Sequence, residues 1–152
     1  MLRHFRTTLI SMTGLLMSTG VFAAADPIYT TLFSNAGAGG YDVVAYFTES
    51  KPVEGKDEYQ TEYSGADWYF SSMENLEAFQ ASPEKYAPQY GGYCAWAVYE
   101  GNLYKGDPQH WTVLNDKLYL NYDAEVQTQW NTNRELHISG ADKNWPKVLE
   151  DD

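Results

Sequence analysis

The stretch that decides the fold most directly is HWTVLNDKLYLNY, residues 110–122. Two runs rich in β-branched and aromatic residues flank the dipeptide Asn115-Asp116, and both of these residues tolerate a left-handed backbone better than most others do. This pattern predicts a β-hairpin. A second hairpin is predicted upstream, because polar residues alternate with aromatic or β-branched ones over 59–63 and an aromatic run at 68–70 follows a turn at 64–67.

Helix signals follow each hairpin. Ser71 or Ser72 can cap a helix, because a serine hydroxyl accepts hydrogen bonds from the free N–H groups of the first helical turn. Pro83 suits the first turn of a further short helix over 83–86, where its missing N–H has no cost. Asp123 is the predicted cap of a helix after the second hairpin.

Three other segments are less regular. Residues 41–47 are apolar and rich in β-branched and aromatic side chains, which predicts a short strand or a tight extended segment. No period can be assigned to 93–98. A last helix is predicted from Asn133 toward Trp145, interrupted near Gly140. No internal repeat is evident.

Strands and helices are mixed without regular βαβ alternation, which predicts an α+β fold with a small antiparallel sheet and short helices packed against it. The length of 152 residues fits one compact domain. Aromatic residues make up 16% of the chain and charged residues only 20%, so the composition is that of a folded domain and not of a disordered acidic tail.

The first 25 residues have the pattern of a signal peptide. A basic start is followed by an interrupted apolar run, which is too short to span a bilayer, and by small residues that permit cleavage after Ala23 or Ala25. The expected product is exported, periplasmic or secreted, and without a membrane span. Residues 26–40 are expected to form a flexible arm because of their glycines, and residues 41–149 to form the folded domain.

The charge excludes one class of partner. Ten Lys and Arg residues stand against 21 Asp and Glu, a net charge of −11, and removal of the two basic residues of the leader gives 8 − 21 = −13. No basic patch remains, so nucleic acid is excluded as a partner.

Few residues can carry chemistry. Cys94 is the only cysteine, so neither an intramolecular disulfide nor a multi-thiolate metal site can form. Neither a G-x-S-x-G elbow nor a glycine-rich phosphate loop is present, and the chain is expected not to be an enzyme.

The sequence leaves three readings of Cys94 open. It can be a small buried residue with an inert thiol. It can bind a soft metal such as copper together with His110, with the thioether of Met73 as a third donor. It can also pair with a thiol of another molecule. His137 is expected on a helix surface, and the many aromatic residues either pack in the core or line a ligand groove.

Several longer motifs resemble the YHS-domain family over about residues 40–149. They are GYDVVAYF (40–47), WYFSSMEN (68–75), PEKYAPQYGGYCA (83–95), GDP (106–108), WT (111–112), KLYLNY (117–122) and NWP (144–146). The resemblance implies a compact α+β module associated with soft or borderline metals, including copper.

The metal-binding members of that family have a Cys or His at the positions of Ser71 and Asn75. This chain has a hydroxyl and an amide there, which are weak ligands for Cu(I) and Zn(II). Two hypotheses therefore remain. The protein binds a soft metal through Cys94 with His110, or it is a ligand- or protein-binding module with an aromatic surface and no metal.

Overall fold

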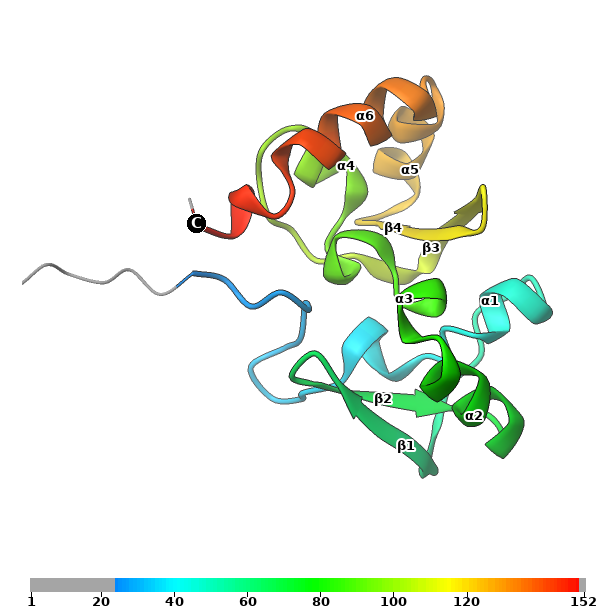
Figure 1. Ribbon diagram of the computed structural model, residues 1–152. Coiled ribbons are helices and arrows are strands. Elements are labelled where there is room, and N and C mark those ends of the chain that lie inside the picture. Colours follow the sequence, from blue (N-terminus) through cyan, green and yellow to red (C-terminus); the bar gives the residue numbers. More distant parts are fainter. Residues whose placement is uncertain (1–23, 151–152) are drawn as a thin grey trace, which may run out of the picture.

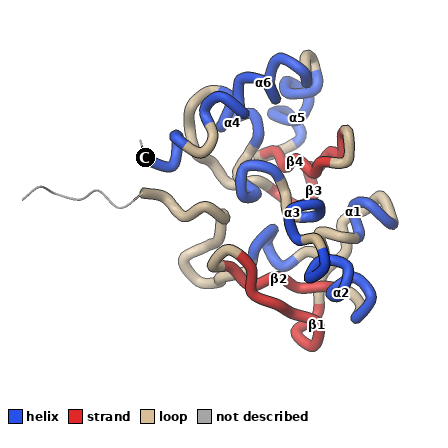
Figure 2. The backbone as a smooth tube through the Cα atoms, in the orientation of Figure 1, coloured by secondary structure: helices blue, strands red, loops and turns tan. Residues whose placement is uncertain are grey.

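The computed structural model describes residues 24–150 and has a compact α+β fold (Figure 1). Two antiparallel hairpins are formed by β1 (Lys56–Tyr63) with β2 (Ala66–Phe70) and by β3 (Asp107–Leu114) with β4 (Lys117–Asn121). Helices surround them: α1 (Ala45–Thr48), α2 (Met73–Ala81), α3 (Pro83–Tyr86), α4 (Ala95–Tyr99), α5 (Ala124–Asn131) and α6 (Arg134–Asn144). Figure 2 shows that strands in this part of the chain are confined to the two hairpins and that helices and loops make up most of the remaining chain. The predicted fold class is confirmed.

The same order of elements occurs twice. Each time, a short 3-10 turn is followed by a short helix, a hairpin and two further helices. The first unit, residues 24–87, contains η1 (Gly37–Gly40) and the elements from α1 to α3. The second unit, residues 88–150, contains η2 (Gln89–Gly92), α4, the second hairpin, α5 and α6. Figure 1 shows the first hairpin and α2 in the lower part of the molecule and α4 to α6 in the upper part.

The two units agree in backbone detail. The φ angles at positions 38–40 are 48°, 62° and 82°, and those at positions 90–92 are 55°, 61° and 84°. Both hairpins have a bulge at the same place: Lys56 pairs with Phe70 before Gln60 pairs with Tyr69, and Asp107 pairs with Asn121 before Trp111 pairs with Leu120. The conclusion that the chain has no internal repeat was therefore wrong.

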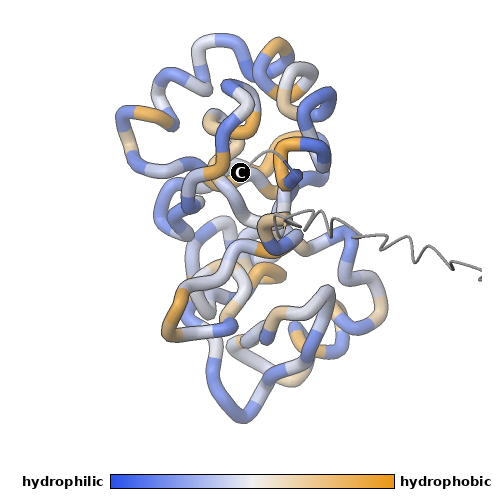
Figure 3. The backbone as a smooth tube through the Cα atoms, turned by 90° about the vertical axis from the view of Figure 1, so that its left-hand side faces the viewer, coloured by the Kyte–Doolittle hydropathy of each residue, from blue (hydrophilic) through white to orange (hydrophobic). Residues whose placement is uncertain are grey.

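The core has two clusters, and strand β4 belongs to both. Leu118 and Leu120 pack with the first unit's cluster around Trp68 and Phe79, whereas Tyr119 packs with the second unit's cluster around Trp130. Successive side chains of a strand point to opposite faces, so β4 forms a wall between the two clusters. In Figure 3, hydrophobic backbone segments accordingly occur in both parts of the molecule.

The structure differs from the sequence-based expectation at residues 41–47. These residues form no strand. Asp42 directs its side-chain oxygen at the backbone N–H groups of Val44 (2.9 Å) and Ala45 (3.2 Å), and the helix α1 begins there. A helix cap has overridden the β preference of the apolar residues.

The last predicted helix has no interruption at Gly140. Helix α6 continues through it. The residue is a glycine because it faces Tyr99 of α4, where a Cβ atom would come within 2.5 Å of the ring. The glycine lets α6 approach the ring of Tyr99 closely.

Residues 26–40, expected from their glycines to form a flexible arm, make contacts with both units. Ile28 is buried in the first unit's cluster, and the N–H of Tyr29 donates to the carbonyl of Gly91 at 2.9 Å. The carbonyl of Asn35 accepts from the N–H of Asp67 at 2.8 Å. Nearly all of the predicted signal peptide, residues 1–23, lies outside the described residues. Over the part that is described, no helix combines the length and hydropathy needed to cross a membrane.

We predict that Gly140→Ala destabilises the protein by about 1–3 kcal/mol, although alanine is normally the better helix former. The added methyl group would collide with the ring of Tyr99. Urea unfolding followed by tryptophan fluorescence measures the effect. Ser139→Ala, at an exposed neighbouring position of the same helix, is the control and should be neutral or slightly stabilising. Equal stability of the two variants would contradict the prediction.

Candidate functional site

Asp42 ties the first unit together where the hairpin ends and α1 begins. The residue is fully buried. One carboxylate oxygen accepts from the start of α1, and the other accepts from the N–H of Ser71 (2.8 Å), its hydroxyl (2.7 Å) and the side-chain amide of Asn75 (2.7 Å). Five hydrogen bonds therefore converge on one buried carboxylate and satisfy its charge.

Cys94 occupies the corresponding position in the second unit. Its backbone N–H donates to the carbonyl of Tyr104 at 2.8 Å, as that of Asp42 donates to Val53 at 2.8 Å. The sulfur receives hydrogen bonds from the backbone N–H groups of Trp96, Ala97 and Tyr122. These donors correspond to those of Val44, Ala45 and Ser71, so the sulfur has taken the place of a carboxylate.

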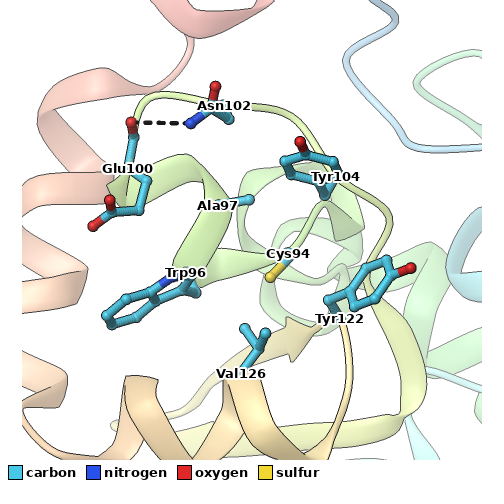
Figure 4. A pocket seen from close by; sticks show the side chains of 8 residues that line it. All are labelled: Cys94, Trp96, Ala97, Glu100, Asn102, Tyr104, Tyr122 and Val126. Carbon is cyan, nitrogen blue, oxygen red and sulfur yellow. Dashed lines mark hydrogen bonds between the residues drawn. The ribbon is translucent and has the colours of Figure 1, made fainter.

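A pocket opens where the second unit lacks the two polar side chains that cover Asp42. Tyr122 and Val126 stand in the positions of Ser71 and Asn75, and a cavity of about 350 Å³ lies beside the sulfur. Figure 4 shows Cys94 pointing into this space, with three aromatic rings, two aliphatic side chains and two polar groups around it: Trp96, Tyr104, Tyr122; Ala97, Val126; Glu100 and Asn102.

The thiol of Cys94 is neutral at physiological pH. Burial raises its pKa, and this outweighs the three backbone N–H groups that lower it, while the nearby charge of Asp123 raises it further. The S–H group points at the side-chain oxygen of Asn121, 3.8 Å away. Asn121 is fully buried, and its amide nitrogen has no hydrogen-bond partner.

Residues 44–90 match the family model of the YHS domain. The chain therefore contains a YHS domain over these residues. The match begins directly before α1 and ends within η2, so it covers most of the first unit and only the first few residues of the second unit, and the Cys94 pocket lies beyond it. The chain matches no curated protein and no solved structure.

The positions that hold metal ligands in YHS relatives are already engaged in this YHS domain. Ser71 and Asn75 both donate hydrogen bonds to Asp42 and have no thiolate or imidazole to offer. Within residues 24–150, His, Cys, Asp and Glu side chains nowhere gather in threes that could hold a metal ion. These residues therefore do not fit a soft-metal centre at the usual place of the family.

The three candidate ligands from the sequence are not assembled at one cavity. Cys94 lines the pocket, and neither His110 nor Met73 does. His110 is half-buried on β3, and Met73 is 51% exposed at the start of α2, in the other unit of the molecule (Figure 1). Binding of one ion by all three donors stays a prediction that no contact in the described residues supports.

Two residues behave differently from expectation. His137 is buried, not on the helix surface: its ring lies 4.8 Å from both Trp96 and Tyr99, and Nδ1 is 2.8 Å from the carbonyl of Trp130. Asp42 was not singled out from the sequence at all. The signal available was the repeated pattern GGY followed by Asp42 or Cys94.

We predict that Asp42→Asn destabilises the protein by about 2–4 kcal/mol, because an amide nitrogen would face donors that now share a carboxylate. Thermal and urea unfolding measure the change. Asp57→Asn removes the same charge from an exposed position of β1 and should stay within about 0.5 kcal/mol of wild type. A loss of similar size in both variants would mean that net charge, not the hydrogen-bonded cluster, is responsible.

Proposed function

We propose that this YHS-domain protein is an exported, non-enzymatic binding protein that holds a small, mainly apolar ligand in the Cys94 pocket of its second unit. The observation that carries the proposal is the cavity itself, which opens at the position where the first unit is closed by Ser71 and Asn75. A closed and an open version of one site thus occur in the same chain.

The size and lining of the pocket support binding of a small molecule. Its volume of about 350 Å³ falls within the range of about 300–1,000 Å³ that is usual for ligand sites. Rings and aliphatic groups form the walls, and Glu100 and Asn102 supply polar groups that can orient a ligand. Such walls give affinity through burial of apolar surface, and a few polar groups give specificity.

The environment of Cys94 argues for binding and against covalent catalysis. A nucleophilic thiol needs a lowered pKa or a neighbouring base. Burial raises the pKa of Cys94, and no histidine lines the pocket. The sulfur therefore acts as a polarizable part of the wall.

The alternative function is binding of a soft metal ion such as copper. It is favoured by one observation, the sulfur that faces the cavity, because thiolates are preferred ligands of Cu(I). It requires His110 or Met73 to reach Cys94, and it requires loss of the thiol proton.

We predict that the protein binds 2-phenylethanol, a neutral aromatic probe, with an affinity in the roughly millimolar range or tighter. Val126→Phe should weaken this binding by about tenfold or more, because the larger ring would fill the cavity. Chemical shift changes in a ¹H–¹⁵N spectrum locate and quantify the binding. Gln129→Phe adds the same ring to an exposed position of the same helix and should leave the affinity unchanged. Absence of shifts around Cys94 would rule out this pocket.

A Cu(I) titration against a competing chelator, under reducing conditions, separates the two functions. The proposed function predicts equally weak binding by wild type and by Cys94→Ala, His110→Ala and Met73→Ala. Tighter binding by wild type, lost in Cys94→Ala and in His110→Ala, would instead establish the metal site.

Export also has a specific expected outcome. The N–H of Ala25 donates to the carbonyl of Leu149 at 2.8 Å, and its side chain packs with the second unit's cluster. Cleavage after Ala23 keeps this contact, whereas cleavage after Ala25 removes it. We therefore predict Ala24 as the first residue of the exported protein, to be read by mass spectrometry of the secreted or periplasmic fraction. Retention of the full chain in the cytoplasm would contradict export.

A further inference from the structure

Aromatic rings surround the mouth of the Cys94 pocket and are unusually exposed. Tyr104 is 60% exposed and Tyr122 is 42% exposed, and the two rings meet edge to face with centroids 6.4 Å apart. Trp96 contributes a third ring to the lining. The face of an aromatic ring carries negative electrostatic potential, so rings arranged around a cavity attract cations.

One of these rings already attracts a cation. The ammonium group of Lys105 lies 5.5 Å from the centroid of the Tyr122 ring. Lys105 does not line the cavity, so the interior of the pocket is not neutralised by this side chain.

Two carboxylates, Glu100 and Asp123, lie beside the cavity, and the cation Lys105 lies at its rim. Glu100 belongs to its lining and takes part in no ion pair; within residues 24–150, the single ion pair joins Lys51 and Glu49. Asp123 caps α5 by accepting from the N–H of Val126, which lines the same cavity. Burial raises the pKa of the Cys94 thiol, and the negative charge of Asp123 is close enough to the sulfur to raise it further. The chain as a whole carries a net charge of −11. An anionic ligand would meet repulsion from the two carboxylates and from this net charge.

We infer that the ligand of the Cys94 pocket is a compact organic cation, an amine or quaternary ammonium compound with an apolar or aromatic body. The inference rests on the proposed function, since it names the class of ligand for the same cavity. The apolar body contacts Ala97, Val126 and the sulfur, and the cationic group lies among the rings and Glu100 at the mouth.

Three probes with the same phenylethyl body test the sign of the charge: 2-phenylethylammonium, the neutral 2-phenylethanol and the anion 3-phenylpropionate. We expect the cation to bind about three- to tenfold more tightly than the anion at low ionic strength, and the difference to shrink in about 0.3 M salt. Isothermal titration calorimetry or chemical shift titration of the full chain provides the affinities.

Two exposed charges near the mouth allow opposite perturbations. Glu100→Gln should weaken binding of the cation by about two- to fivefold, and Lys105→Gln should strengthen it by a similar factor, because they remove an attraction and a repulsion. Neither change should alter the affinity for the neutral alcohol. Glu77→Gln, on the exposed face of α2 in the first unit, removes the same charge as Glu100→Gln and should have no effect on the cation.

The outcomes distinguish this inference from the proposed function. Binding of the alcohol or the anion as tightly as the cation, with loss of binding in Val126→Phe, would overturn the cation inference and leave the pocket as a ligand site. Absence of binding by all three probes would overturn both. Binding of the cation that responds equally to Glu100→Gln and Glu77→Gln would reduce the effect to net charge and also overturn the inference.

Discussion

The fold depends on one kind of interaction, in which a single buried side chain accepts backbone N–H groups from two distant segments. Asp42 does this for the start of α1 and for Ser71, and Cys94 does it for the start of α4 and for Tyr122. Helix starts and chain turns leave N–H groups that must be paired when they are buried. The acceptor thus joins the end of each hairpin to the beginning of its short helix, and the rest of each unit packs around that junction.

The two acceptors differ in how much hydrogen bonding they demand. A carboxylate has room for several strong donors and draws in the side chains of Ser71 and Asn75, which close the site. A thiol is a weak acceptor, and the donors that reach the Cys94 sulfur are backbone N–H groups. The side chains of Tyr122 and Val126, unlike those of Ser71 and Asn75, do not cover the acceptor, and a cavity remains. The chemistry of one side chain therefore separates a structural junction from a candidate binding site on the same backbone.

Local signals predicted the local structure well. Both hairpins lie where alternation and turn residues placed them, and Ser72, Asp123 and Asn133 cap helices as short polar residues do. Features that depend on distant residues were missed. The strand expected at 41–47 does not form, and α1 begins at Ala45, because Asp42 is held by residues 29 and 33 positions away. The repeat escaped notice because equivalent positions carry unlike side chains. The pocket combines residues from 94–104 with Tyr122 and Val126, which are too far apart along the chain for a local pattern to connect them.

The double role of β4 has a thermodynamic consequence. Leu118 and Leu120 belong to the core of the first unit, and Tyr119 belongs to that of the second, so neither core is complete when the strand is displaced. The two repeated units must therefore unfold as one cooperative system, despite their similar architecture. A ligand bound at Cys94 would therefore stabilise the whole chain, and the first unit would be protected from unfolding as well as the second.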